Sequence, residues 1–169
     1  MSDAAPTLVI GLGNPLMGDD GFGLAVLAEL RERWRMPGDV ELVDGGTWGI
    51  RLLPLLDGAE RVLFLDAVDR GAAPGTPFVL EGDELPRALC HKLSPHQIDL
   101  REVLALASFR GSMPQDVVAV GAQPADVQLR DGLSPVLEHR IGDIAGLAVR
   151  TLKAWGHDVP RADGSDRAD

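Results

Sequence analysis

The sequence predicts a three-layer α/β fold in which a mostly parallel sheet of about five strands carries helices on both faces. Two observations predict this fold. Short apolar runs that are typical of buried strands alternate along the chain with segments of helical periodicity. The chain has 169 residues, of which 45% are hydrophobic, and this suits one globular domain. We expect a single α/β domain over residues 1–155 and a polar, flexible tail over residues 156–169.

The first half of the domain is predicted to contain three strands and two helices. Its strands are the apolar runs Thr7–Gly11, Val40–Val43 and Arg61–Ala67. The segment Phe22–Trp34 repeats leucine and valine at helical spacing and stops before Pro37-Gly38, which predicts an amphipathic helix. A short helix is predicted over Ile50–Leu56, where Pro54 limits its length. The unbroken apolar character of the third strand indicates a central position in the sheet.

The second half of the domain adds two predicted strands and two predicted helices. The strands are Thr76–Glu81, which follows a Pro-Gly turn, and Asp116–Val120. Between them, Asp99–Phe109 places leucine, valine and alanine on one helical face. Ser134 and Pro135 are predicted to begin a long helix that extends to about residue 155, because serine caps helix amino termini and proline suits the first turn.

The charge and composition exclude several classes of function. The chain carries 26 acidic and 16 basic residues, a net charge of −10, so it repels phosphate backbones and nucleic acid is not an expected partner. Cys90 is the only cysteine, which excludes an intrachain disulfide and a cysteine-based zinc site and suits a reducing cytoplasm. Residues 1–6 lack the features of a signal peptide, and no stretch approaches the length of a membrane span. We therefore expect a cytoplasmic protein without membrane insertion.

Polar residues gather where the predicted strands end. In open α/β sheets, ligands bind beyond the carboxyl ends of the parallel strands. The polar residues at these positions are Asn14, Asp19 and Asp20 after the first strand, Asp44 and Thr47 after the second, and Asp66 at the end of the third. His96 follows later, in front of the helix predicted from Asp99. Several carboxylates and one imidazole are therefore expected at one edge of the sheet.

The carboxylates at this edge allow more than one interpretation. Asp66 follows a buried apolar run, and a buried carboxylate needs a hydrogen bond, an opposite charge or a metal. It could bind a metal, or it could accept backbone N–H bonds in a turn. Asp19 and Asp20 precede a predicted helix, where acidic side chains commonly cap free N–H groups. We interpret Asp19 as the cap and Asp20 as the ligand.

Two carboxylates and one imidazole form a ligand set of two oxygens and one nitrogen. This set suits a divalent transition metal such as nickel or zinc and leaves coordination positions open. Asp20, Asp66 and His96 are the residues that would supply it. The alternative for His96 is an ordinary surface or core histidine, because it is one of four histidines in the chain.

Other catalytic and cofactor motifs fit the sequence less well. Gly11, Gly13 and Gly18 suggest a dinucleotide-binding loop, but their spacing differs from GxGxxG. Asp19 and Asp20 would also repel a pyrophosphate at the helix amino terminus. The sequence contains no GxSxG nucleophile motif. Cys90 and His91 are adjacent in sequence and so seldom face each other as a catalytic pair, and we expect Cys90 in the core.

Four short segments stand out as motifs that occur together. They are GLGNPLMGDDGFG over residues 11–23, DGGT over 44–47, LDA over 65–67 and SPHQ over 94–97. In their order and spacing they resemble the hydrogenase maturation protease family, the endopeptidases that process the C-terminus of nickel–iron hydrogenases. The resemblance covers roughly residues 7–155, which is nearly the whole chain.

The resemblance implies a role for each candidate residue. It implies that Asp20, Asp66 and His96 contact a metal ion. Many family members carry glutamate at the position of Asp20, and the shorter aspartate keeps the charge with less reach. The DGGT motif is implied in substrate recognition and cleavage, which makes Asp44 a candidate catalytic residue beside Asp20 and Asp66. The candidate substrate-binding residues are Asn14, Gly45, Gly46 and Thr47.

The resemblance also implies a reaction. The substrate would be the large-subunit precursor of a nickel–iron hydrogenase, already loaded with nickel, and the protease would remove a short C-terminal extension from it. The nickel would be carried by the substrate, so that the protease is metal-free at rest. A monomer is expected.

Two alternatives stay open on the sequence alone. A nickel-binding chaperone could use the same three ligands without cleaving a peptide bond. Peptidyl-tRNA hydrolases share a Gly-Leu-(Gly/Ala)-Asn-Pro opening and an α/β sheet. A tRNA substrate requires a basic surface, however, and this chain is acidic.

Overall fold

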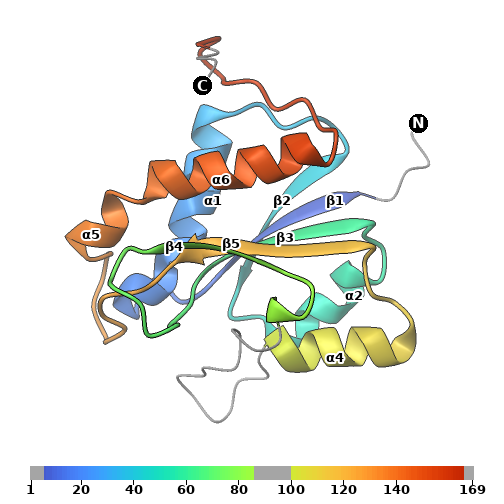
Figure 1. Ribbon diagram of the computed structural model, residues 1–169, viewed down its shortest axis with the longest axis horizontal. Helices are drawn as coiled ribbons and strands as arrows, with labels where there is room; N and C mark the ends of the chain where they lie inside the picture. The colour runs from blue at the N-terminus through green and yellow to red at the C-terminus, as the bar shows by residue number, and fades with distance from the viewer. Residues whose placement is uncertain (1–5, 86–99, 166–169) are drawn as a thin grey trace.

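The five predicted strands form one sheet, which confirms the mostly parallel α/β fold (Figure 1). The computed structural model describes residues 6–85 and 100–165. The strands are β1 (Thr7–Leu12), β2 (Val40–Gly46), β3 (Arg61–Ala67), β4 (Pro77–Glu81) and β5 (Asp116–Ala122). They lie in the order β2-β1-β3-β5-β4; the first four of these are parallel, and β4 is antiparallel to β5.

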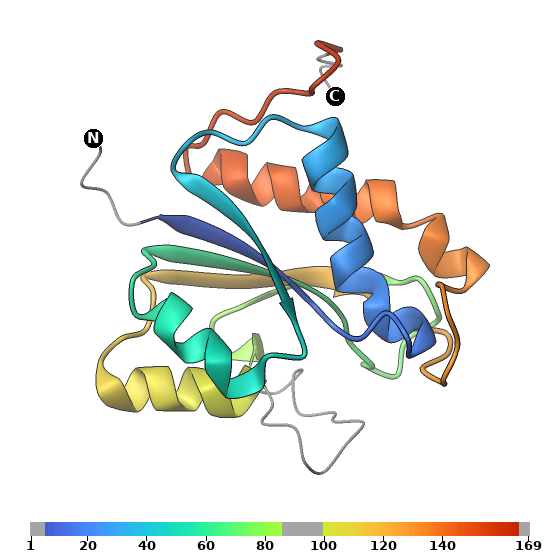
Figure 2. The same cartoon turned by 180° about the vertical axis from the view of Figure 1, so that it is seen from behind.

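Helices cover both faces of the sheet, as Figures 1 and 2 show. They are α1 (Phe22–Arg33), α2 (Leu53–Leu56), α4 (Leu100–Arg110), α5 (Pro135–Glu138) and α6 (Ile141–Ala154), together with the 3-10 helices η1 (Gly18–Gly21) and η2 (Gly49–Leu52). α1 and α6 pack on one face, and α2 and α4 pack on the other, so the three predicted layers are confirmed. Within the described ranges, no helix has the length and apolar character needed to cross a membrane.

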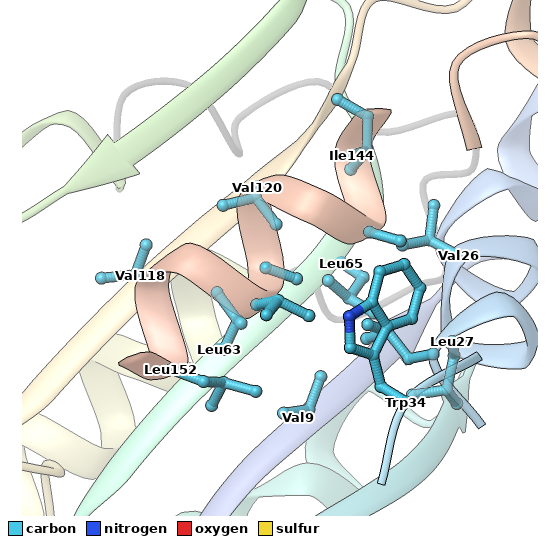
Figure 3. Packing of buried hydrophobic residues seen from close by; sticks show 14 of the residues in the cluster. Val9, Val26, Leu27, Trp34, Leu63, Leu65, Val118, Val120, Ile144 and Leu152 are labelled. Atoms are coloured by element: carbon cyan, nitrogen blue, oxygen red, sulfur yellow. The ribbon is translucent and has the colours of Figure 1, made fainter. Parts of the chain in front are cut away.

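Successive side chains of the central strands point to opposite faces of the sheet and so contribute to the core on both sides. Val9, Leu63 and Leu65 belong to the cluster formed with α1 and α6, which Figure 3 shows. Ile10 and Phe64 belong to the opposite cluster, formed with α2 and α4. All five side chains are fully buried. A strand that is buried on both faces needs apolar residues at every position, which explains the unbroken apolar runs in the sequence.

The long helix predicted to begin at Pro135 is interrupted after α5, so its predicted continuity is wrong. The N–H of Arg140 bonds to the carbonyl of Leu137, three residues back rather than four, and the turn tightens before α6 begins. Ser134 precedes α5 but makes no side-chain cap, because its hydroxyl donates to Asp19 instead.

Residues 156–165 pack against the domain, although their composition predicts a flexible tail. Val159 is 1% exposed and joins the core beside α1 and α6. Arg161 lies over the ring of Trp34, 4.9 Å from its centroid, and the two residues pair as an isolated antiparallel bridge. One buried valine and one cation–π contact thus hold this segment on the domain. Its polar composition alone resembles that of a flexible tail.

Candidate functional site

The carboxyl edge of the sheet is built around the ends of β1 and β3. Asp66 is the next-to-last residue of β3 and pairs with Gly121 of β5. A Cβ at position 121 would lie 1.7 Å from the carbonyl oxygen of Asp66, so only glycine fits there. The neighbouring strand therefore confines the backbone at Asp66.

Glycines of the GLGNPLMGDDGFG motif bring η1 and α1 onto the same edge. A Cβ at Gly23 would lie 2.1 Å from the carbonyl oxygen of Leu65 and 2.5 Å from that of Leu12. α1 begins in direct contact with the ends of β3 and β1 because residue 23 is glycine. Gly13 has a φ of 118°, and a Cβ there would lie 1.7 Å from the carbonyl oxygen of Asp20. These close backbone contacts set Asp20 at the end of β3.

Asp20 lies within η1, and its side chain is partly buried. The backbone N–H of Asn14 donates to its Oδ2 at 2.8 Å. Burial raises the pKa of Asp20 above its ordinary value, and the hydrogen bond from Asn14 opposes this rise. The loop in front of η1 therefore holds this carboxylate in one orientation.

The carboxylate of Asp66 shares this edge with Asp20. Burial raises the pKa of Asp66 to about 8, and the negative charge of Asp20 adds to this rise. The N–H of Ala67 donates to Asp66 Oδ1 at 2.8 Å and acts in the opposite direction. This is one backbone bond within β3 rather than a set of bonds in a turn, and it does not offset the burial. Two carboxylates that repel each other in this way are stabilised by a shared proton or by a cation.

Asp19 differs from its neighbour Asp20, because it is fully buried. Its carboxylate accepts hydrogen bonds from Ser134, Ala125 and Asp126, which follow 106 or more residues later in the chain. Burial acts to raise the pKa of Asp19, but these hydrogen bonds outweigh it and hold the pKa below its ordinary value. The prediction that Asp19 caps a helix is therefore wrong, since its side chain binds a distant segment.

Asp44 is exposed and lies apart from the pair formed by Asp20 and Asp66. Gly11 in β1 pairs with Asp44 on one side and with Leu65 on the other. Asp44 therefore shares the face of Leu65, which α1 and α6 cover, while Asp66 lies on the opposite face. Two strand spacings, about 10 Å, separate the backbones of β2 and β3. The structure thus does not bring the third candidate catalytic carboxylate together with the other two.

The candidate substrate-binding residues connect two neighbouring loops. The N–H of Gly13 donates to the carbonyl of Gly46 at 2.9 Å, which ties the DGGT loop to the loop that contains Asn14. Thr47 is exposed and Asn14 is half-buried, so both keep surface that is open to solvent. Gly45 is buried and contributes to packing instead.

His96, the third predicted metal contact, lies outside the described residues, as does the whole SPHQ motif over 94–97. Cys90, which the sequence predicts in the core, lies outside them as well. Among the residues that the structure describes, no three histidine, cysteine, aspartate or glutamate side chains form a metal-binding group. The predicted set of three ligands therefore stays a prediction.

α4, which follows His96 by four residues in the sequence, runs from the carboxyl edge of the sheet toward the amino edge. The segment after α4 lies at the amino edge, because the N–H of Gln115 donates to the carbonyl of Glu60 at 2.7 Å, just before β3 begins. α4 is about 16 Å long, so its first residue, Leu100, lies that far from its end at Arg110, toward the carboxyl edge.

Gln123, which was not predicted from the sequence, organises the loop after β3. Gln123 directly follows β5 and is 6% exposed. Its Oε1 accepts the N–H groups of Arg70 at 2.7 Å and Ala72 at 3.2 Å. Its Nε2 donates to Asp69 Oδ1 at 2.9 Å. A buried polar side chain directly after an apolar strand is the signal that singled out Asp66, so the same signal could have found Gln123.

Sequence comparisons relate the chain to proteins of hydrogenase maturation. Residues 24–151 match the family described as hydrogenase maturation protease. The hydrogenase expression/formation protein HupD of Rhodobacter capsulatus is 38% identical over 156 residues, covering 91% of this chain and 74% of the relative. The hydrogenase 2 maturation protease of Escherichia coli K12 is 34% identical over 156 residues, covering 91% of this chain and 95% of the relative.

Solved structures share the fold across nearly the whole chain. The hydrogenase maturating endopeptidase HybD from Escherichia coli matches with a TM-score of 0.88 at 32% identity, covering 95% of this chain and 99% of the other. The maturation protease HycI from Thermococcus kodakarensis matches with a TM-score of 0.69 at 26% identity, covering 90% and 95%. Neither the chaperone nor the peptidyl-tRNA hydrolase alternative gains support from these similarities. By sequence and by fold, the chain belongs to the hydrogenase maturation protease family and is a peptide-bond hydrolase.

Proposed function

We propose that this protease removes a C-terminal extension from the large-subunit precursor of a nickel–iron hydrogenase after the precursor has received nickel. Membership of the family gives the reaction class, which is hydrolysis of a peptide bond during hydrogenase maturation. In this proposal the nickel arrives with the substrate, and the protease recognises it through Asp20, Asp66 and His96.

The electrostatic repulsion between Asp20 and Asp66 at the carboxyl edge of the sheet carries the proposal. Burial already disfavours the charged form of Asp66, and the charge of Asp20 disfavours it further. A divalent cation would neutralise both groups and remove this repulsion. Perturbed carboxylates at the edge where α/β proteins bind their ligands are typical of a functional site.

The chemistry of the ligand set is compatible with nickel as the cation. Two carboxylate oxygens and one imidazole nitrogen suit a divalent transition metal. We propose His96 as the source of the nitrogen, because it precedes α4 by four residues and α4 begins toward the same edge. Three protein ligands leave coordination positions for groups of the precursor, so that only a nickel-loaded precursor completes the site.

The exposed loops beside the carboxylate pair are proposed to bind the extension peptide. The N–H of Asn14 donates to Asp20, and the loop of Asn14 is hydrogen-bonded to the DGGT loop that carries Thr47. Asp44 belongs to the DGGT motif, and two strand spacings, about 10 Å, separate the backbone of its strand from that of Asp66. This separation favours a role for Asp44 in cleavage of the peptide rather than in contact with nickel.

The proposed setting is a cytoplasmic monomer that is metal-free until it meets its substrate. A single cysteine suits a reducing compartment, and with a net charge of −10 nucleic acid is not an expected partner. The partner in this proposal is the nickel-loaded large-subunit precursor alone.

The test is incubation of the protein with nickel-loaded and with nickel-free precursor, followed by mass spectrometry of the large subunit. Loss of mass from the C-terminus of the nickel-loaded precursor alone is the expected result. Equal loss from both precursors would contradict nickel recognition. An unchanged nickel-loaded precursor, with nickel transferred to the protein, would favour a nickel-binding chaperone instead.

A further inference from the structure

Asp19 is fully buried next to Asp20, and the proposed reaction gives it no role. Its Oδ1 accepts the N–H of Ser134 at 2.6 Å, and its Oδ2 accepts the hydroxyl of Ser134 at 2.8 Å. Oδ2 also accepts the N–H groups of Ala125 at 2.8 Å and Asp126 at 3.1 Å. The hydrogen-bonding capacity of this carboxylate is therefore committed to the protein itself.

Backbone hydrogen bonds tie the same two segments together. The N–H of Gly18 donates to the carbonyl of Arg130 at 2.9 Å, and the N–H of Arg130 donates to the carbonyl of Leu16 at 3.0 Å. The N–H of Asp19 donates to the carbonyl of Asp126 at 3.0 Å. η1 is thus anchored to residues 125–134 through both its backbone and the side chain of Asp19.

This anchor is coupled to Asp20 through a short and confined backbone. Asp19 and Asp20 are consecutive residues of η1, and the N–H of Asp20 donates to the carbonyl of Met17 at 3.2 Å. The carbonyl of Asp20 packs so closely against Gly13 that no Cβ fits between them. The carboxylate of Asp20 accepts the N–H of Asn14 at 2.8 Å. A shift of η1 at Asp19 is therefore transmitted to the Asp20 carboxylate and to its bond with Asn14.

We infer that Asp19 is a positioning residue for the carboxylate pair. It holds η1 against residues 125–134, and η1 holds the Asp20 carboxylate beside Asp66. The effect of Asp19 on cleavage rests on the proposed function. The positioning is a property of the free protein and is measurable without substrate.

A role of Asp19 in stability alone makes a different prediction. Loss of the anchor would then lower thermal stability and leave the Asp20 carboxylate in place. The amide proton of Asn14 reports on that carboxylate, because it donates to Asp20 Oδ2. Its NMR chemical shift therefore distinguishes positioning from stability.

The first arm of the test compares Asp19→Asn, Ser134→Ala and Val159→Ala in amide correlation spectra of the full chain. Asp19→Asn replaces an acceptor oxygen by a donor group and should move the Asn14 resonance. Ser134→Ala removes one of the four donors, retains the buried carboxylate and should move the resonance by less. Val159→Ala is the matched control, because it removes core volume beside the end of α1, and it should lower the Tm without moving the resonance.

The second arm measures cleavage of nickel-loaded precursor at saturation. Asp19→Asn should slow cleavage roughly 10- to 100-fold, the range for a reacting group displaced by about 1 Å. Ser134→Ala should slow it less, and Val159→Ala should cleave like the wild type. Wild-type cleavage by Asp19→Asn would overturn its role in the reaction.

The two arms separate this inference from the proposed function. An unmoved Asn14 resonance in both Asp19→Asn and Ser134→Ala would overturn the positioning of Asp20 by Asp19. If the wild-type protein cleaves no precursor, the proposed function fails, and the Asn14 resonance still decides whether Asp19 positions Asp20.

Discussion

At the amino end of β3 a charged side chain has partners of opposite sign, whereas near its carboxyl end the carboxylates of Asp20 and Asp66 repel each other. Arg61, the first residue of β3, donates to Asp116 Oδ2 at 3.0 Å and lies 3.4 Å from Glu60. Near the other end of the same strand, burial and the charge of Asp20 raise the pKa of Asp66 to about 8.

Along β3, the charged groups at the amino end therefore serve stability, and those near the carboxyl end serve function. The ion pairs at the amino end favour the folded state, because each charged group gains a partner there. The repulsion at the carboxyl end opposes the folded state, because a buried carboxylate near a second one resists ionisation. Such repulsion is retained where activity requires it, and it is relieved when a cation binds.

The largest effect is expected when the charge of Asp66 is removed. Asp66→Asn keeps the shape of the side chain but offers no carboxylate to a metal, so cleavage of nickel-loaded precursor should fall more than about 100-fold. Mass spectrometry over time measures the cleavage, and circular dichroism checks that the fold is retained. Cleavage at the wild-type rate would exclude Asp66 from the reaction.

The next effect concerns the proposed third ligand. His96→Ala should weaken the binding of nickel, or of cadmium as a surrogate, by at least roughly tenfold, because one of three protein ligands is lost. Titration calorimetry on the isolated protein measures this affinity. His139→Ala is the matched control, because His139 is exposed at the end of α5. Equal affinities for the wild type and His96→Ala would count against His96.

The third effect concerns stability, and here Asp66→Asn is expected to improve the protein rather than impair it. The pKa of Asp66 rises from 3.8 to about 8 on folding, so the folded state keeps a proton that the unfolded state releases between these values. The contribution of Asp66 to stability is therefore lost as the pH rises from about 4 to about 8. Asp66→Asn lacks this proton.

Urea denaturation of the wild type and Asp66→Asn at pH 5 and pH 8 measures this effect. The advantage of Asp66→Asn in free energy of unfolding should grow by at least about 1.4 kcal/mol between the two pH values, which corresponds to one pKa unit. A difference that does not depend on pH would contradict the raised pKa.

The smallest effect is expected at the amino end of the sheet. Arg61→Met keeps most of the apolar stem but removes the guanidinium that contacts Asp116 and the carbonyl of Trp155. The free energy of unfolding should fall by about 1–2 kcal/mol, because the ion pair is partly exposed to solvent. Cleavage of the precursor should stay unchanged. A loss of cleavage by folded Arg61→Met would show that the amino end of β3 contributes to function as well as to stability.

Much of the fold could be predicted because buried strands carry a local pattern. β3 has the predicted bounds, Arg61–Ala67, because both of its faces are apolar. β2 extends beyond its predicted end to Gly46, because its backbone pairs with β1 through glycines that look like a loop. The interruption between α5 and α6 falls at His139 and Arg140, and such polar residues suit the exposed face of a continuous helix as well as a turn.

The site could be predicted only where the signal is local. Asp66 stands out because it directly follows an apolar run, and Asp20 stands out as part of a motif. The role of Asp19 depends on Ser134, which lies 115 residues later and looks like a helix cap when the sequence is read alone. The placement of Asp44 depends on strand register, which a motif does not contain.

A crystal structure of the protein with nickel or cadmium bound tests the central claim most directly. That claim is that the two carboxylates at the end of β3 and in η1 bind one cation together. The predicted result is an ion between Asp20 and Asp66, with the imidazole of His96 as a third ligand and bond lengths of about 2.0–2.4 Å. An ion bound elsewhere, or an imidazole of His96 directed away from the two carboxylates, would contradict it.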